Sequence, residues 1–233
     1  MTPTLSAHVN TNSTTSAVTA LSSGAITVNN GDVIVVKTTC DSNSTVIGTP
    51  TASGQTFTSR ASKTDSTHCP TAIFTAVVTG SPGTITVSQV YSGSGSWRSA
   101  VYERWTNAQL ATTPATNGTM EVTSNPGFTG TLTTVAANSS VSWVAGDFTP
   151  ANPGTEAYQS GAIEDGFHNK FSANTYVAYY ATQDAVSAGS QTFGLTTPAS
   201  GGSVWTYIGI EIEQAAGAAA PLFTDLMPPQ INH

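Results

Sequence analysis

The side chains in this chain that could carry chemistry are few and widely spaced. Its four histidines stand in separate polar stretches, at His8, His68, His168 and His233. Nucleophilic and acid–base catalysis need a nucleophile, a base and an orienting group within hydrogen-bond reach of one another. The sequence contains no GxSxG nucleophile elbow, no GxGxxG or GxxxxGK phosphate loop and no HExxH zinc motif. We therefore expect a protein that is not an enzyme and that carries no cofactor.

One acidic pair lies beside a histidine. Glu164 and Asp165 precede Gly166, and His168 follows two residues later. Together with Asp147 these side chains could supply oxygen ligands to a hard cation. Adjacent carboxylates before a glycine are more often a solvated turn, so we expect such a turn here, without a metal.

Glu103 differs from the other acids because it lies within an apolar run. It shares one strand face with Trp105, and Arg104 follows it. A charge on the inner face of a sheet requires a buried partner, so we expect one of these two charges to form a structural ion pair. A glycosidase would need two carboxylates about 5–10 Å apart across the sugar. The scattered acids Glu103, Glu121 and Glu156 show no spacing that selects such a pair.

Trp205 and Tyr207 are the clearest candidates for a binding surface. They lie on the strand face opposite an isoleucine stripe, and an aromatic platform on a β-sandwich can stack on sugars. Trp97 and Tyr91 flank a Gly/Ser-rich loop and are secondary candidates. The alternative is that a second sheet or a neighbouring subunit covers these rings, because both faces of a sandwich strand are rarely bare.

Cys40 and Cys69 are the only cysteines, and each ends a strand-like run beside turn residues. One disulfide between them would close a loop of about thirty residues and contribute ~3 kcal/mol in the chain-entropy model. We expect this disulfide; the alternative is two buried thiols. A metal site is not expected, because the two cysteines and His68 lack a fourth ligand and CxxC spacing.

Strands rather than helices carry these residues. The last strand is the clearest, with a period of two: Val204, Thr206, Ile208, Ile210 and Ile212 fall on one face, and Trp205, Tyr207, Gly209, Glu211 and Glu213 on the other. Further strand-like runs lie at residues 33–36, 56–63, 72–78, 85–87, 101–105, 141–145, 176–180 and 193–195. An Asn-Gly turn at residues 29–32 between two apolar runs predicts a hairpin. No segment shows a helical period with caps.

The pattern predicts an all-β fold, a single jelly-roll-like β-sandwich over residues 23–214. Residues 1–22, rich in Ser, Thr and Asn, are predicted to be an extended N-terminal arm or an edge strand. Residues 215–233 are predicted to be a linker followed by an apolar C-terminal tail. The tail would expose Leu222, Phe223, Leu226 and Met227 unless it docks. We expect it to dock on a neighbouring subunit or another partner; packing back on its own domain is the alternative.

Composition narrows the class of partner. Charged residues make up 8% of the 233 residues, and the formal net charge is −7 with only six Lys and Arg. A typical soluble domain has about 25% charged residues. The scattered cations form no basic stripe, so we expect no binding to nucleic acid or to anionic membranes. The Ser/Thr/Asn/Gly-rich surface indicates a protein that faces the outside, yet no signal peptide or transmembrane stretch is visible. A virion protein would fit both observations; a secreted protein whose signal was replaced by Met1 is the alternative.

Several short motifs resemble one family when taken together. They are residues 31–36 (GDVIVV), 55–58 (QTFT), 83–87 (GTITV), 101–105 (VYERW) and the closing strand at 205–212. Over about residues 24–214 the chain resembles a jelly-roll β-sandwich domain of virion proteins of actinobacterial phages and related bacterial surface proteins. The resemblance implies a virion structural protein, a minor tail protein or a capsid (head) decoration protein, without enzymatic activity.

We therefore expect a structural protein of a bacteriophage particle, assembled in the host cytoplasm and exposed on the particle exterior. Its expected partners are other virion proteins, capsid or tail subunits, and further copies of itself in a homo-oligomer, with a trimer as the usual symmetry. The alternative is a carbohydrate-binding or adhesin β-sandwich module that contacts a host cell-wall glycan. A secreted hydrolase domain is the third interpretation.

Overall fold

The computed structural model describes most of the chain, in segments. These segments are residues 2–14, 18–42, 44–64, 69–93, 97–110, 116–122, 127–148, 157–169, 176–197 and 204–216, with only the backbone described for 116–122. The described part is all-β and antiparallel, apart from the short 3-10 turn η1 (Gln159–Gly161), and this confirms the predicted fold class. Within it, no helix is long and apolar enough to cross a membrane.

The first half of the chain forms two sheets. Its strands are β1 (Thr4–Asn12), β2 (Ala20–Thr27), β3 (Val33–Cys40), β4 (Val46–Ile47), β5 (Thr58–Lys63), β6 (Thr71–Val77), β7 (Thr84–Ser92) and β8 (Arg98–Thr106). Five of them pair in the order β1-β8-β3-β6-β5, and the other three in the order β2-β7-β4. The N-terminal segment is therefore an edge strand rather than a free arm.

The second half repeats this arrangement. Its strands are β10 (Thr116–Val122), β11 (Phe128–Thr134), β12 (Ser139–Asp147), β13 (Ala157–Tyr158), β14 (Ile163–Asn169), β15 (Val177–Val186), β16 (Gly189–Thr197) and β17 (Val204–Gln214). They pair in the orders β10-β17-β12-β15-β14 and β11-β16-β13. Both orders are those of the first half with every strand number raised by nine. The short β9 (Ala108–Gln109) joins the halves and pairs with β17.

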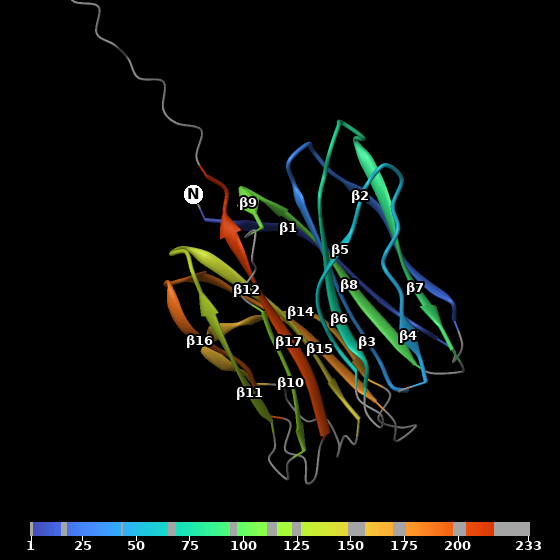
Figure 1. Ribbon diagram of the computed structural model, residues 1–233, viewed down its shortest axis with the longest axis vertical. Helices are drawn as coiled ribbons and strands as arrows, with labels where there is room; N and C mark the ends of the chain where they lie inside the picture. Colours follow the sequence, from blue (N-terminus) through green and yellow to red (C-terminus); the bar gives the residue numbers. More distant parts are fainter. Residues whose placement is uncertain are drawn as a thin grey trace, which may run out of the picture.

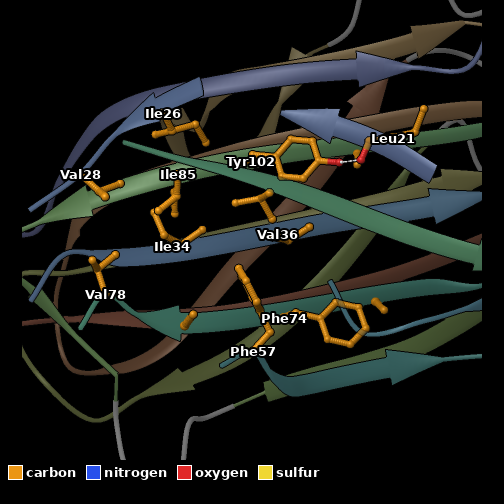
Figure 2. Packing of buried hydrophobic residues seen from close by; sticks show 14 of the residues in the cluster. Leu21, Ile26, Val28, Ile34, Val36, Phe57, Phe74, Val78, Ile85 and Tyr102 are labelled. Carbon is orange, nitrogen blue, oxygen red and sulfur yellow. Dashed lines mark hydrogen bonds between the residues drawn. The ribbon is translucent and has the colours of Figure 1, made fainter. Parts of the chain in front are cut away.

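The four sheets stack as four layers (Figure 1), with the two three-stranded sheets outside and the two larger ones between them. Apolar clusters fill each of the three interfaces. Figure 2 shows the first, where Ile26 and Ile85 of the outer sheet meet Ile34 and Phe74 of the inner one. Tyr102 closes this interface by donating its hydroxyl hydrogen to the Leu21 carbonyl at 2.6 Å.

The two inner sheets are buried on both faces. All eight residues of β3 and all nine of β12 are buried. Strands covered on both faces have no side to present to water, so their polar residues, such as Lys37 and Ser142, need buried partners. The expectation of sandwich packing is confirmed, but each inner sheet serves two interfaces rather than one.

The predicted hairpin at residues 29–32 is wrong. The turn exists, with Gly31 at a φ of 88°, but β2 pairs with β7 and β3 pairs with β6 and β8. The chain therefore crosses from one sheet to the next at this turn. The Asp32 carboxylate holds the corner, because it accepts hydrogen bonds from the Asn29 amide and Arg104 Nε, both at 2.7 Å.

The alternation predicted for the last strand is confirmed by β17, but the aromatic platform is wrong. Trp205 is 0% exposed and Tyr207 is 4% exposed. The outer sheet β11-β16-β13 covers them, with Phe128 stacked on Tyr207 at a ring-centroid distance of 4.4 Å. The alternative interpretation, burial under a second sheet, therefore holds for these two rings.

Burial of Trp205 predicts a stability effect rather than a loss of binding. We expect Trp205→Ala to lower the free energy of unfolding by about 3–5 kcal/mol, because it empties a large volume between two sheets. Urea denaturation of the purified protein measures this change. Val46→Ala, at a 62% exposed position, is the control and should stay within about 0.5 kcal/mol of wild type. A Trp205→Ala protein as stable as the control would contradict the layered packing.

Candidate functional site

Three charged side chains meet at the centre of the molecule. Lys37 lies on β3, Glu103 on the neighbouring β8, and Asp165 on β14 of the facing sheet. The register pairs Lys37 with Val101 and Val35 with Glu103, which places Lys37 and Glu103 diagonally on one sheet face. This face packs against the second inner sheet.

Asp165 reaches the same interface because of a β-bulge. The pairing of β14 with β15 shifts register between Glu164 and Gly166, so Asp165 is the extra residue, and a bulge re-aims the side chain that it inserts. Gly166 also permits close packing here. A Cβ at Gly166 would lie 2.8 Å from atoms of Asn10 and Val101.

The three charged groups are in direct contact, and their side chains are buried. Lys37 Nζ forms ion pairs with Glu103 Oε1 and, at 2.7 Å, with Asp165 Oδ2. All three side chains are at most 1% exposed. Lys37 Nζ also donates to the Ala181 carbonyl at 3.3 Å. Removing a single partner from such a set leaves an uncompensated buried charge, which typically costs 3–5 kcal/mol.

Neutral donors fix both carboxylates. Trp105 Nε1 donates to Glu103 Oε2 at 2.9 Å, and Ser142 Oγ donates to the same oxygen at 3.0 Å. Thr182 Oγ1 donates to Asp165 Oδ2 at 2.7 Å. These donors come from β8, β12 and β15, so strands of both inner sheets orient the charged groups.

Burial and mutual attraction shift the pKa of each group. Burial raises the pKa of Glu103 from 4.5 to about 7, in spite of the opposing attraction of Lys37. Burial also raises the pKa of Asp165, but the charge and hydrogen bond of Lys37 outweigh it and hold that pKa below its ordinary value. For Lys37, burial lowers the pKa, and the two carboxylates together raise it above its ordinary value. Of the three groups, Glu103 is therefore the one whose pKa lies nearest to neutral pH.

A cavity of about 450 Å³ lies beside this network. Its walls are residues 5–8 of β1, residues 163–165 of β14, and Thr182 and Asp184 of β15. Asp165 and Thr182 belong to both the network and the cavity wall. Near the cavity, Asn10 and Asn12 of β1 donate to the Phe167 carbonyl at 3.0 and 3.1 Å, so β1 and β14 are tied together. The cavity leads from the surface to a buried carboxylate.

The arrangement can do two kinds of chemistry. The exposed acids Glu164 and Asp184 give the cavity a negative wall that favours a cationic group over an anion. The network itself places an amine nitrogen against a carboxyl group in a site without exposed atoms. Among the described residues, no group of three or more His, Cys, Asp or Glu is arranged to hold a metal ion.

The structure confirms one predicted site residue, corrects another prediction and does not describe several others. Glu103 is paired inside the sheet stack, as predicted. The expected solvated turn at Glu164–Gly166 is wrong: these residues lie in β14, and Asp165 is only 3% exposed. Glu156, His68, His233 and the tail residues Leu222, Phe223, Leu226 and Met227 lie outside the described residues, as does the side chain of Glu121.

The cysteines are two separate buried thiols, the alternative to the expected disulfide. Cys40 ends β3, and Cys69 precedes β6. Burial raises the pKa of Cys40 to about 12 and the pKa of Cys69 well above its ordinary value. Because the thiolate is the reactive form, both are unreactive at neutral pH while the fold is closed.

The sequence interpretation missed Lys37 as the partner of Glu103. A usable signal was present, because Lys37 follows Val33 and Val35 on one face of a run that is otherwise apolar. A lysine at an inward position of a doubly buried strand requires an acid. Its pairing with Asp165, 128 residues away, carries no local signal.

The raised pKa of Glu103 predicts a specific pH dependence. The folded state binds this proton more tightly than the unfolded chain does. The resulting contribution of Glu103 to the free energy of unfolding is therefore full below about pH 4.5 and is lost as the pH rises through about 7. Its size is roughly 3 kcal/mol for a shift of this extent. Glu103→Gln should remove this part of the pH dependence, which urea denaturation between these pH values measures. If the free energy of unfolding changed with pH in the same way in the wild type and in the variant, the raised pKa would not belong to Glu103.

Comparison with known proteins does not identify a family for this chain. No protein-family model, no curated protein and no solved structure matches the chain. The resemblance to phage jelly-roll domains therefore stays a hypothesis, and function has to be argued from the residues and the geometry of this chain.

Proposed function

We propose that this protein is a structural component of a bacteriophage particle, displayed on the tail or the capsid surface. The observation that carries the proposal is the repeated strand order. We number the strands of each half from 1 to 8, starting at β1 and at β10. In each half, four strands then pair in the order 1-8-3-6 opposite a sheet of order 2-7-4, and strand 5 pairs with strand 6. This is the pairing that nested Greek keys produce, and we assign each half as a jelly roll. Jelly rolls build viral capsid proteins and lectins.

The outer faces support a role in dense assembly. Strand β11 exposes Thr129, Thr131 and Thr133, and β7 exposes Thr84 and Thr86. Short hydroxyl side chains lose less rotamer entropy on contact than lysine, arginine or glutamate. Such faces can be covered by neighbouring subunits at small entropic cost.

The proposal includes a mode of assembly. The chain would form a homo-oligomer, with a trimer as the expected symmetry, and its apolar tail after residue 216 would dock on a capsid or tail subunit. The burial of Trp205 and Tyr207 removes the aromatic platform that favoured the carbohydrate-binding alternative. This burial favours the structural role over glycan binding.

Particle composition tests the proposal. Mass spectrometry of gradient-purified phage particles should find this chain in fixed stoichiometry with the major capsid or tail protein, while an abundant host cytoplasmic protein serves as the contamination control. Absence of the chain from particles would contradict the proposal. Retention on host cell-wall glycans, together with such absence, would instead support the adhesin alternative.

A further inference from the structure

The buried network holds an amine and a carboxyl group in a position to react. Lys37 Nζ lies 2.7 Å from Asp165 Oδ2, and the two residues come from opposite sheets. Both are fixed by further hydrogen bonds, to the Ala181 carbonyl and from the Thr182 hydroxyl. Holding two reactants in contact makes a slow bimolecular condensation effectively unimolecular.

We propose that Lys37 and Asp165 join through an intramolecular isopeptide bond, with Glu103 as the acid–base group that moves the protons. The bond would be a covalent modification of the folded chain, made by the chain itself. It is independent of where the protein is displayed and does not rest on the virion assignment.

The reaction balances without any other reagent. The Lys37 ammonium passes a proton to Glu103, and the resulting amine attacks Asp165 Cγ. The Nζ–Cγ bond forms, one Cγ–O bond breaks, and the departing oxygen takes two protons through Glu103 and leaves as water. One ammonium and one carboxylate become one amide and one water molecule, and Glu103 returns to its starting state.

Glu103 is suited to the proton transfer and not to the amide bond. Both of its oxygens are held, by Lys37, Trp105 and Ser142. Its pKa of about 7, raised by burial, allows it to accept and return a proton at neutral pH. Lys37 is an ammonium at rest because its pKa is raised, so direct contact with this acceptor is what frees the nucleophile.

Asp165 is suited to be the acceptor carboxyl. Of the three charged side chains of the network, it alone lines the cavity, so the released water has a way out. The apolar residues of the same interface, among them Val35, Val101 and Tyr180, exclude bulk water from the reacting atoms. The product amide would therefore be protected from hydrolysis.

The bond would tie the two halves of the molecule together. It links β3 of the first repeat to β14 of the second and closes a loop over a sequence separation of 128 residues. A cross-link of this span constrains the unfolded chain in the way that a long-range disulfide does. It would do so without a redox-sensitive bond.

Intact-mass spectrometry of the denatured full-length chain tests the proposal. The wild type should be lighter than its sequence mass by one water molecule, and tandem spectra should show a branched peptide joining Lys37 to Asp165. Lys37→Met, Lys37→Arg and Glu103→Gln should restore the full mass, whereas the control Lys63→Met, on β5, should keep the loss. A wild-type chain of full mass would overturn the proposal.

A second source of water loss must be separated from the bond. Asp165 precedes Gly166, and Asp-Gly sequences can cyclise to a succinimide with loss of one water. A loss of one water that persists in Lys37→Met would assign the loss to that cyclisation and overturn the proposal. Cleavage of the wild type by trypsin after Lys37 would do the same, because trypsin does not cleave after a lysine whose amine is in an amide bond. The wild-type spectra decide between these outcomes even if a variant fails to fold.

Discussion

The structure depends on accommodating one lysine ammonium between two sheets. Lys37 has no exposed side-chain surface, and an isolated charge there would be too costly to keep ionised. Its neutralisation by Glu103 and Asp165 sets requirements on several other elements. The bulge in β14 must direct Asp165 inward, and Trp105, Ser142 and Thr182 must supply donors to the carboxylates.

The same region is where the two repeats meet. Each half has the same strand order, and the larger sheets of the two halves face each other across the cluster that contains Val35, Tyr180 and Ile208. Apolar burial is non-directional, so an apolar interface alone favours contact between the sheets without a directional interaction. The ionic network adds a directional contact, and we infer that it fixes how the halves are aligned. The covalent bond proposed between Lys37 and Asp165 would make this alignment permanent.

Sequence reasoning predicted what a strand's own alternation determines. The all-β class, the closing strand at 204–212 and an inward Glu103 all follow from which residues share a face. Alternation does not say which sheet covers a face, and this is why the sequence left both an exposed platform and a covered face open for Trp205 and Tyr207. The same limit explains the false hairpin at residues 29–32, because a tight turn is compatible with pairing or with crossing between sheets. The contact between Lys37 and Asp165 depends on the packing of two sheets far apart in sequence.

We infer that this network joins the two inner sheets into one cooperative unit. Native-state hydrogen exchange of the wild type and of Lys37→Met can show whether the sheets are coupled, because exchange reports the stability of each strand separately. In the wild type, amides of β3 and β17 should share the highest protection, and the substitution should lower both by the same factor. Loss of protection confined to the sheet that contains β3, with β12 and β17 unchanged, would show that the network does not couple the two sheets.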